Sequence, residues 1–261
     1  MLQVDGLTLG YGGEPVLDGF DLRVEAGRFV SLVGPSGSGK SSVLRAVTGL
    51  QPHQAGRIAL DVAEGQVGFL FQDDALLPWR TARENVALGL RIRGEAKAAA
   101  HVRADVWLER LGLADLGGRY PRQLSGGQRK RVAIAQVLAL QPRLLLMDEP
   151  FASLDAIVRH RLTADLLTWV ERERLTVLLV THDLEEALTL SDEVLLLAGG
   201  PRASVRRRFD VPLPRPRDLV GARTHPAFAP LLRDLWEMMA DEVDAGTAAG
   251  AAGERPGAVA R

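Results

Sequence analysis

Residues 34–41 read GPSGSGKS, a spacing of glycines, lysine and serine that is typical of a phosphate-binding loop. Glycines let the backbone wrap closely enough for its N–H groups to point at phosphate oxygens, and the start of a following helix adds partial positive charge. The mostly apolar residues 29–33, which read as a strand, precede the loop and a helical pattern follows it, which argues against a chance glycine-rich turn. The residues expected to line this site are Gly34, Pro35, Ser36, Gly37, Ser38, Gly39, Lys40, Ser41 and Ser42.

Lysine is rare in this chain, because arginine fills 29 of the 32 basic positions and lysine occurs only at Lys40, Lys97 and Lys130. A lysine in the loop therefore indicates a need for a compact point charge rather than a planar fork. We expect Lys40 to reach the β and γ phosphates and the hydroxyl of Ser41 to bind magnesium.

Two adjacent carboxylates, Asp148 and Glu149, follow the apolar residues 144–147. A buried strand of this kind ends at the carboxyl edge of a parallel sheet, where ligands bind in open α/β folds. Asp148 can hold magnesium through water, and Glu149 can orient or deprotonate an attacking water. Alone the pair is weak evidence, since acidic residues also cap helices; the phosphate loop in the same chain strengthens it.

A second anion site is indicated by Ser125, Gly126, Gly127 and Gln128, which open a helical pattern with N–H and hydroxyl donors. The alternative is a serine-glycine turn that only caps the helix. A small-molecule or nucleotide kinase would share the phosphate loop but has no use for this second site.

The elements that must position these residues form an α/β pattern. Strands are expected at 2–9, 20–24, 28–33 and 57–60, and buried strands of a mainly parallel sheet at 67–71, 144–147, 176–180 and 194–197. The spacing of apolar residues predicts a helix over 156–172 with Trp169 in the core. Residues between Gln72 and Ser125 are helical in pattern and predict an inserted subdomain.

Composition excludes several classes of protein. The chain has 261 residues, 46% hydrophobic and 25% charged, with a net charge of −1. It has no cysteine, which removes disulfides, thiolate metal sites and cysteine nucleophiles. It has no apolar run of the roughly 18 to 20 residues that span a bilayer and no secretory pattern at its start, so we expect a cytoplasmic protein whose work at a membrane would need a separate anchor.

These motifs, in this order over residues 2–197, resemble the nucleotide-binding subunit of ATP-binding cassette (ABC) transporters. The resemblance implies a P-loop NTPase with an antiparallel β subdomain and an inserted helical subdomain. It further implies that Tyr11 stacks on adenine, that Gln72 senses magnesium and the membrane partner, and that His182 contacts the γ-phosphate. Residues 125–128 match the family's signature sequence. Ser153, Leu154 and Asp155 match the loop that crosses the dimer interface.

The same resemblance implies a mechanism. Two copies meet head to tail, and ATP with Mg²⁺ lies between the phosphate loop of one and Ser125 and Gly127 of the other. Magnesium would be held by Ser41, Gln72 and Asp148, while Glu149 activates water. Plain packing roles for Tyr11, Gln72 and His182 are the alternatives. Family members also commonly have glutamine where this chain has Lys130 and arginine where it has Gln136.

Residues 73–88 resemble the permease-docking region of subunits that import nitrate, sulfonate or taurine. Leu76, Leu77 and Trp79 are the expected contacts, or else they pack the subdomain. The implied partners are transmembrane permease subunits and a periplasmic or lipid-anchored solute-binding protein, with no nucleic acid. The chain would be peripheral to the cytoplasmic face of the membrane. Uptake of a pyrimidine precursor, or a soluble ABC ATPase that does not transport, are the alternative functions.

The expected organisation is an ATPase domain over 1–210, with the helical subdomain at about 73–140 inside it. A C-terminal extension with a helix follows over 211–240, and then a disordered tail over 241–261 that is rich in alanine and glycine. The cluster Arg206, Arg207 and Arg208 could touch lipid headgroups or the permease, and a solvated strand edge is the alternative.

Overall fold

The computed structural model describes residues 1–12, 14–63, 65–152 and 154–253, with side chains described up to residue 244. The chain divides into two compact units. The first contains residues 1–25, 29–60 and 180–261, and the second contains residues 26–28 and 61–179. Each unit is α/β in composition, as the sequence predicts.

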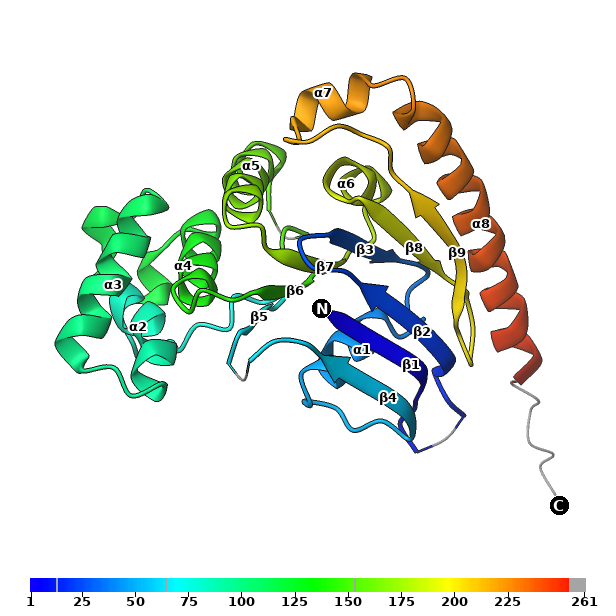
Figure 1. Ribbon diagram of the computed structural model, residues 1–261, viewed down its shortest axis with the longest axis horizontal. Coiled ribbons are helices and arrows are strands. Elements are labelled where there is room, and N and C mark those ends of the chain that lie inside the picture. Colours follow the sequence, from blue (N-terminus) through cyan, green and yellow to red (C-terminus); the bar gives the residue numbers. More distant parts are fainter. Residues whose placement is uncertain (13, 64, 153, 254–261) are drawn as a thin grey trace, which may run out of the picture. The chain divides into compact units, whose positions relative to one another are not determined.

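A three-stranded antiparallel sheet in the first unit has the order β2-β1-β4 (Figure 1). Its strands are β1 (Leu2–Leu9), β2 (Leu17–Val24) and β4 (Ala55–Leu60). Buried and exposed residues alternate along β1 and β2, as expected for strands that bury one face. The antiparallel β subdomain is thereby confirmed, although β2 begins at residue 17 rather than 20.

The phosphate loop in this unit joins the wholly buried strand β3 (Phe29–Val33) to helix α1 (Lys40–Val47). Strand β8 (Glu193–Leu197) pairs with β3 in parallel, and β9 (Val205–Asp210) pairs with β8 antiparallel. Helix α6 (Leu184–Leu190) precedes β8.

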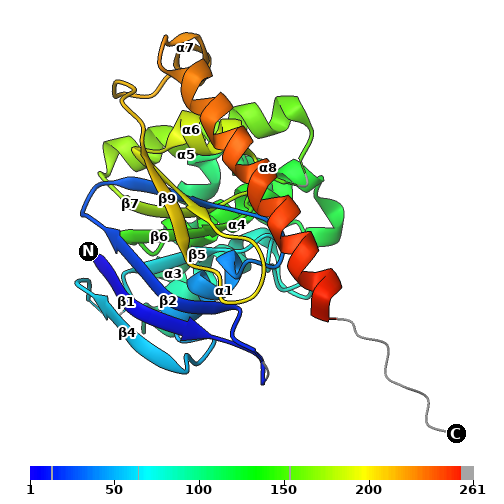
Figure 2. The same cartoon turned by 90° about the vertical axis from the view of Figure 1, so that its right-hand side faces the viewer.

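The C-terminal extension folds onto the same unit. Helices α7 (Leu219–Thr224) and α8 (Phe228–Gly253) bury Ala222, Phe228, Leu235 and Met239 in a core shared with α6, β8 and β9; Figure 2 shows the path of α8. The helix continues past residue 240, where the sequence analysis ended the helical part, because alanine favours helix more than any other residue. Of the expected tail, residues 254–261 lie outside the described residues.

The second unit contains three neighbouring strands of a sheet, in the order β5 (Val67–Leu70), β6 (Leu144–Asp148) and β7 (Thr176–Val180). Only the last residue of β7, Val180, belongs to the first unit. Helix α4 (Gly126–Leu138) begins within the signature residues, after Ser125, and helix α5 (Ala156–Arg172) begins after Asp155.

The predicted helical insertion is confirmed in the same unit. It consists of α2 (Ala82–Ile92), α3 (Lys97–Arg110) and two short 3₁₀ turns, η1 (Ala114–Leu116) and η2 (Pro121–Gln123). Helix α2 starts at a capping box, in which Thr81 and Glu84 exchange hydrogen bonds. Trp169 is half-buried, not a full core residue: its ring lies 5.0 Å from that of Trp107 on α3. Among the described residues, no helix combines the length and the apolar character that crossing a membrane requires.

Candidate functional site

The phosphate loop depends on two glycines for its path. Gly39 is the N-cap of α1 with a φ of 89°, a left-handed conformation that strains other residues. A Cβ on Gly39 would lie 2.8 Å from Cγ of Leu17, and one on Gly34 would lie 2.9 Å from Cβ of Leu197. Side chains at either position would push the loop off the strands that support it.

Lys40 lies within this loop, with its side chain largely buried. Its Nζ donates hydrogen bonds to the carbonyl oxygens of Gly34 at 2.8 Å and Pro35 at 2.7 Å, and lies 3.5 Å from Oγ of Ser38. The ammonium is therefore held inside the loop by the loop's own backbone, in a position suited to an anion that the loop binds.

Tyr11 presents its ring to solvent, with 67% of the residue exposed. Its hydroxyl is 2.8 Å from Oγ of Ser42 and donates to Oε1 of Gln51 at 3.0 Å. An exposed aromatic ring whose hydroxyl is anchored beside α1 is suited to stacking on a base. Gln51 was not predicted as a site residue, because its neighbours in the sequence do not distinguish it from a surface glutamine.

His182 follows Thr181, which is hydrogen-bonded to the strand that leads into the phosphate loop. The backbone N–H of Thr181 donates to the carbonyl of Leu32 at 3.4 Å, two residues before Gly34. Asp183 caps α6 by accepting from the N–H of Glu186 at 3.0 Å. This geometry brings the exposed His182 to the strand end where the loop begins.

In the second unit, β5 and β6 pair in parallel, with Leu70 opposite Met147. Both strands end at one edge of the sheet, which brings the exposed Gln72 close to Asp148 and Glu149. Asp148 is 5% exposed.

Glu149 has a φ of 43°, a left-handed backbone that costs a residue other than glycine about 1–3 kcal/mol. Strain of this kind persists where the surrounding structure imposes it, and it occurs most often at functional sites. The backbone conformation of Glu149 is therefore imposed by the surrounding structure and is not the one that a glutamate prefers.

The signature residues open helix α4 as a complete capping box. Oγ of Ser125 accepts from the N–H of Gln128 at 3.3 Å, and Oε1 of Gln128 accepts from the N–H of Ser125 at 2.8 Å. Capping thus occurs, yet it does not exclude a ligand, since the first N–H groups of a helix have no partner within the helix. Asp155 caps α5 by accepting from Val158 at 2.9 Å; Leu154 is buried, and Ser153 lies outside the described residues.

The contacts between Lys130 and the segment that contains Asp74 were not predicted from the sequence. Lys130 is a buried lysine on α4 that contacts residues 71–74, the segment that contains Gln72. The rarity of lysine, applied above to Lys40, was a signal that also pointed to Lys130.

The expected docking residues lie in the segment before α2. Leu76 and Leu77 are half-buried, whereas Trp79 is 70% exposed. Asn85 is fully buried and holds the segment through hydrogen bonds to Leu77 and to two later carbonyls. Packing therefore explains the two leucines in part, but it does not explain Trp79.

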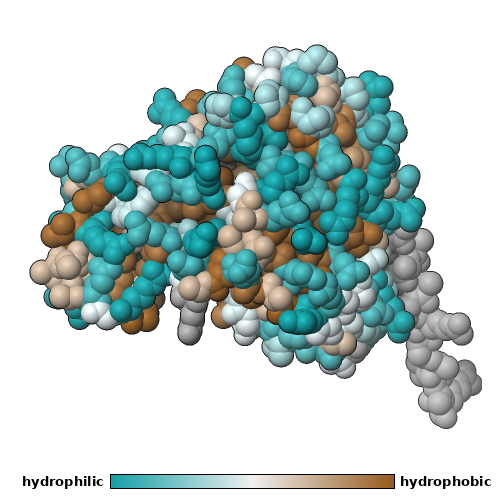
Figure 3. Space-filling model, viewed as in Figure 1, coloured by the Kyte–Doolittle hydropathy of each residue, from teal (hydrophilic) through white to brown (hydrophobic). Residues whose placement is uncertain are grey.

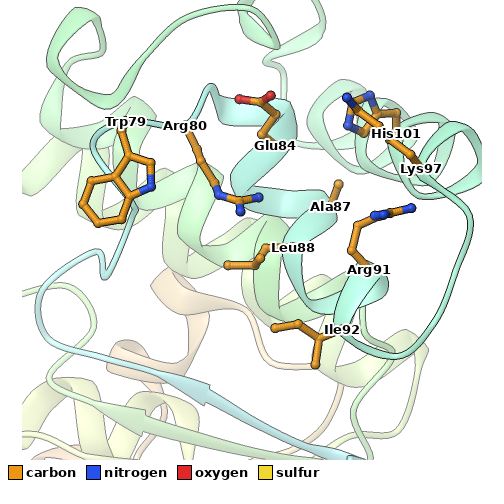
Figure 4. A pocket seen from close by; sticks show the side chains of 9 residues that line it. All are labelled: Trp79, Arg80, Glu84, Ala87, Leu88, Arg91, Ile92, Lys97 and His101. Carbon is orange, nitrogen blue, oxygen red and sulfur yellow. The ribbon is translucent and has the colours of Figure 1, made fainter.

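Trp79 borders a cavity of about 500 Å³ on the helical insertion (Figure 4). Hydrophilic and hydrophobic residues are mixed on the face of the helical insertion that Figure 3 shows. The pKa of Glu84 in the lining is lowered, first by the hydrogen bond from the N–H of Thr81, against an opposing effect of burial. The other lining side chains are mostly basic or apolar: Trp79, Arg80, Ala87, Leu88, Arg91, Ile92, Lys97 and His101.

The three arginines of β9 make contacts within the first unit. Arg206 pairs with Glu242 of α8 at 3.0 Å, and Arg208 pairs with Glu193 at 3.2 Å. The guanidinium of Arg207 lies 4.8 Å from the centre of the Phe209 ring.

Comparison with known proteins identifies the family. The model of the ABC transporter family matches residues 17–152. The chain is 42% identical to the taurine import ATP-binding protein TauB of Escherichia coli O157:H7 over 79% of this chain and 83% of that protein. It is 43% identical to the aliphatic sulfonates import ATP-binding protein SsuB of Delftia acidovorans over 90% and 93% of the two chains.

Among solved structures, the dimeric structure of MJ0796, a bacterial ABC transporter cassette, matches with a TM-score of 0.71 and 31% identity, over 81% of this chain and 99% of that one. The post-hydrolysis dimer of the same cassette, bound to ADP and Pi, matches with a TM-score of 0.70. The chain therefore belongs to the ABC transporter family, as one of its ATP-binding and ATP-hydrolysing cassettes.

Proposed function

We propose that this chain is the ATPase subunit of an importer, in which two copies bind ATP between them and drive a separate permease. The observation that carries the proposal is the register of β5 and β6, which brings Gln72, Asp148 and Glu149 to one edge of the sheet in a chain that also has a phosphate loop closed around Lys40.

In each copy, Lys40 and the backbone N–H groups of residues 34–39 bind the phosphates of ATP, and the ring of Tyr11 stacks on the base. Mg²⁺ fits the donor set of Ser41, Gln72 and Asp148, since a hydroxyl, an amide oxygen and a carboxylate are the hard oxygen ligands it prefers. When bound, it neutralises charge on the phosphates.

Glu149 orients and deprotonates the attacking water, and the imidazole of His182 stabilises the transferred phosphoryl group. The left-handed backbone at Glu149 supports this role, because strained backbone conformations of this kind cluster at active sites. Ser125 and Gly127 of the other copy bind the γ-phosphate, with Gly126 and Gln128 shaping the cap and Asp155 at the interface. This arrangement explains why one chain has two anion sites, the phosphate loop and residues 125–128: each contacts a different ATP molecule.

The permease docks at Trp79 and the adjoining cavity on the helical insertion, and the half-buried Leu76 and Leu77 lie in the same segment. Four of the nine residues that line the cavity have basic side chains, and one, Glu84, is acidic. The basic residues are Arg80, Arg91, Lys97 and His101. A helix with an apolar face and acidic flanks is the complementary partner. The chain is then peripheral to the cytoplasmic face of the membrane.

The solute we propose is an organosulfonate. Two of the relatives reported above import taurine or aliphatic sulfonates, at 42–43% identity over most of both chains. Because a permease and a solute-binding protein select the solute, the proposed solute rests on the sequence similarity to these relatives and not on a site in this chain. We also propose an ATPase domain over residues 1–210, with its helical subdomain at about 73–140, followed by a C-terminal extension.

The test is ATP hydrolysis by the purified chain and by Glu149→Gln, with Glu109→Gln as the control at an exposed glutamate of α3. We expect Glu149→Gln to lose turnover by about 10²-fold or more while binding ATP as tightly as the wild type. Hydrolysis by Glu149→Gln at the wild-type rate would refute the assignment. Reconstituted with its permease and binding protein, the wild type should show hydrolysis stimulated by taurine or an alkanesulfonate and not by nitrate.

A further inference from the structure

A buried lysine ties the signature helix to the segment that follows β5. Lys130 is on α4, four positions after Gly126, and its side chain is 1% exposed. A buried ammonium is costly unless every donor finds an acceptor, so the contacts of Lys130 identify what it holds in place.

Within the described part of the chain, the Nζ of Lys130 contacts residues 71–74. It donates to the carbonyl of Gln72 at 2.9 Å and more weakly to that of Phe71 at 3.4 Å, and it pairs with Oδ1 of Asp74 at 3.1 Å. The lysine thus fixes the backbone on both sides of the Gln72 Cα.

The neighbouring residue extends the connection to the signature. Arg129 pairs with the other carboxylate oxygen of Asp74 at 3.3 Å. It also donates to the carbonyl of Leu124 at 2.8 Å, one residue before Ser125. Asp74 therefore lies between two adjacent cations of α4, and one of them also holds the approach to the signature.

We propose that Lys130 is a positioning residue that makes the Gln72 segment and the signature end of α4 move as one body. A shift of Gln72 is then transmitted to Ser125 and Gly127 through the Lys130–Asp74–Arg129 contacts. This inference rests on the proposed function, in which Gln72 contacts one nucleotide and Ser125 contacts the other.

The phosphate loop makes none of these contacts: Lys40 and its partners are in the first unit, and Lys130 contacts residues 71–74 in the second. Loss of Lys130 should therefore affect turnover far more than ATP binding. A residue with a purely structural role would lower both together or change only thermal stability.

The test compares Lys130→Met, Lys130→Gln and the control Arg131→Met in the full chain. Arg131 is the next residue on α4 and donates to the carbonyl of Leu111 instead, so its loss removes a cation without touching the Gln72 segment. We expect Lys130→Met to lower kcat by on the order of 10- to 100-fold, with the Kd for a fluorescent ATP analogue within about twofold of wild type. The kcat of Lys130→Gln, whose neutral amide keeps two of the three N–H donors, should lie between those of the wild type and Lys130→Met.

Hydrogen exchange supplies the second readout. In Lys130→Met, amides of residues 71–77 should exchange about tenfold faster or more, while those of β1 exchange as in the wild type. The proposal is overturned if Lys130→Met matches Arg131→Met in both kcat and exchange, or if its exchange rises equally throughout the chain.

A double-mutant cycle covers the case in which Lys130→Met does not fold. Lys130→Gln and Asp74→Asn disturb the same contact, so their combined loss of kcat should be smaller than the product of the separate losses; a loss equal to the product overturns the coupling. Failure of the proposed function is distinguishable, because Glu149→Gln would then hydrolyse ATP normally, whatever Lys130 does.

Discussion

A Cβ built on Gly127 would lie 2.7 Å from Cγ1 of Val158, closer than real Cβ contacts come. Helix α4 can therefore pack closely against the first turn of α5 only because Gly127 has no side chain. Val158 lies three residues after Asp155, the N-cap of α5. Both residues belong to the second unit, so this contact joins residues 125–128 to the start of α5.

We therefore predict that Gly127→Ala is destabilising even though alanine favours helix over glycine by about 1 kcal/mol. Overpacking costs about 1–3 kcal/mol and should outweigh that gain. Urea unfolding of the full chain measures it. The double variant with Val158→Ala should recover most of the loss, whereas Gly126→Ala, which has no close neighbour but the end of Arg129, serves as the control. Equal stability of Gly127→Ala and Gly126→Ala would contradict the packing argument.

Lys40→Met should reduce ATP hydrolysis by about 10²-fold or more, because the loop loses the charge that faces the outer phosphates. It should also weaken binding of a fluorescent ATP analogue. Arg45→Met removes an exposed cation from the same helix and should leave both measurements near the wild-type values. Comparable losses in the two variants would mean that net charge, and not the position of Lys40, determines binding.

Trp79→Ala should abolish stimulation of ATP hydrolysis by the permease while the isolated subunit hydrolyses ATP as before. The physical reason is the loss of an exposed apolar anchor at the cavity edge. Trp236→Ala removes another exposed tryptophan, on α8, and is the matched control. Stimulation that survives in Trp79→Ala would contradict docking of the permease at this residue.

Asp192 connects the extension to the core of the first unit. Its carboxylate pairs with Arg215 at 2.8 Å and with the buried Arg217 at 3.4 Å, and it accepts from the N–H of Phe29 at 2.8 Å. Burial raises the pKa of Asp192, but the hydrogen bonds from Arg215 and Phe29 and the charges of Arg215 and Arg217 together lower it below its ordinary value.

Because the pKa of Asp192 is lower in the folded state, the ionised form stabilises the fold above the ordinary carboxyl pKa of about 4, and that stability is lost as pH falls through the folded pKa. Asp192→Asn should lower the free energy of unfolding by about 3 kcal/mol at pH 7, and the deficit should shrink below about pH 4. Urea unfolding across pH measures both. Asp61→Asn, at an exposed aspartate, should show no such pattern; a constant deficit for Asp192→Asn would contradict the titration.

Local motifs made much of the fold and site predictable from sequence. The phosphate loop, the carboxylates after β6 and the Ser125 cap depend on residues close together in the chain, so their patterns are visible without a structure. Lys130, Gln51 and Val158 are different, because their partners lie 58, 40 and 31 positions away. Only the folded chain shows what such residues contact.

Element ends were also less predictable than element types. Strand β2 begins at Leu17, whose buried side chain lies against Gly39 of the phosphate loop, a tertiary contact that no local pattern indicates. Helix α8 extends beyond residue 240 because alanine favours helix even where apolar periodicity is absent.

The most direct test of the account is the mass of Glu149→Gln in solution, measured by sedimentation with Mg²⁺ and ATP. If nucleotide binds between two head-to-tail copies, blocking hydrolysis should shift the protein from the mass of one chain to that of two, and the shift should vanish when Ser125 and Gly127 are also replaced by bulkier residues. A single-chain mass with saturating Mg²⁺ and ATP would contradict the account.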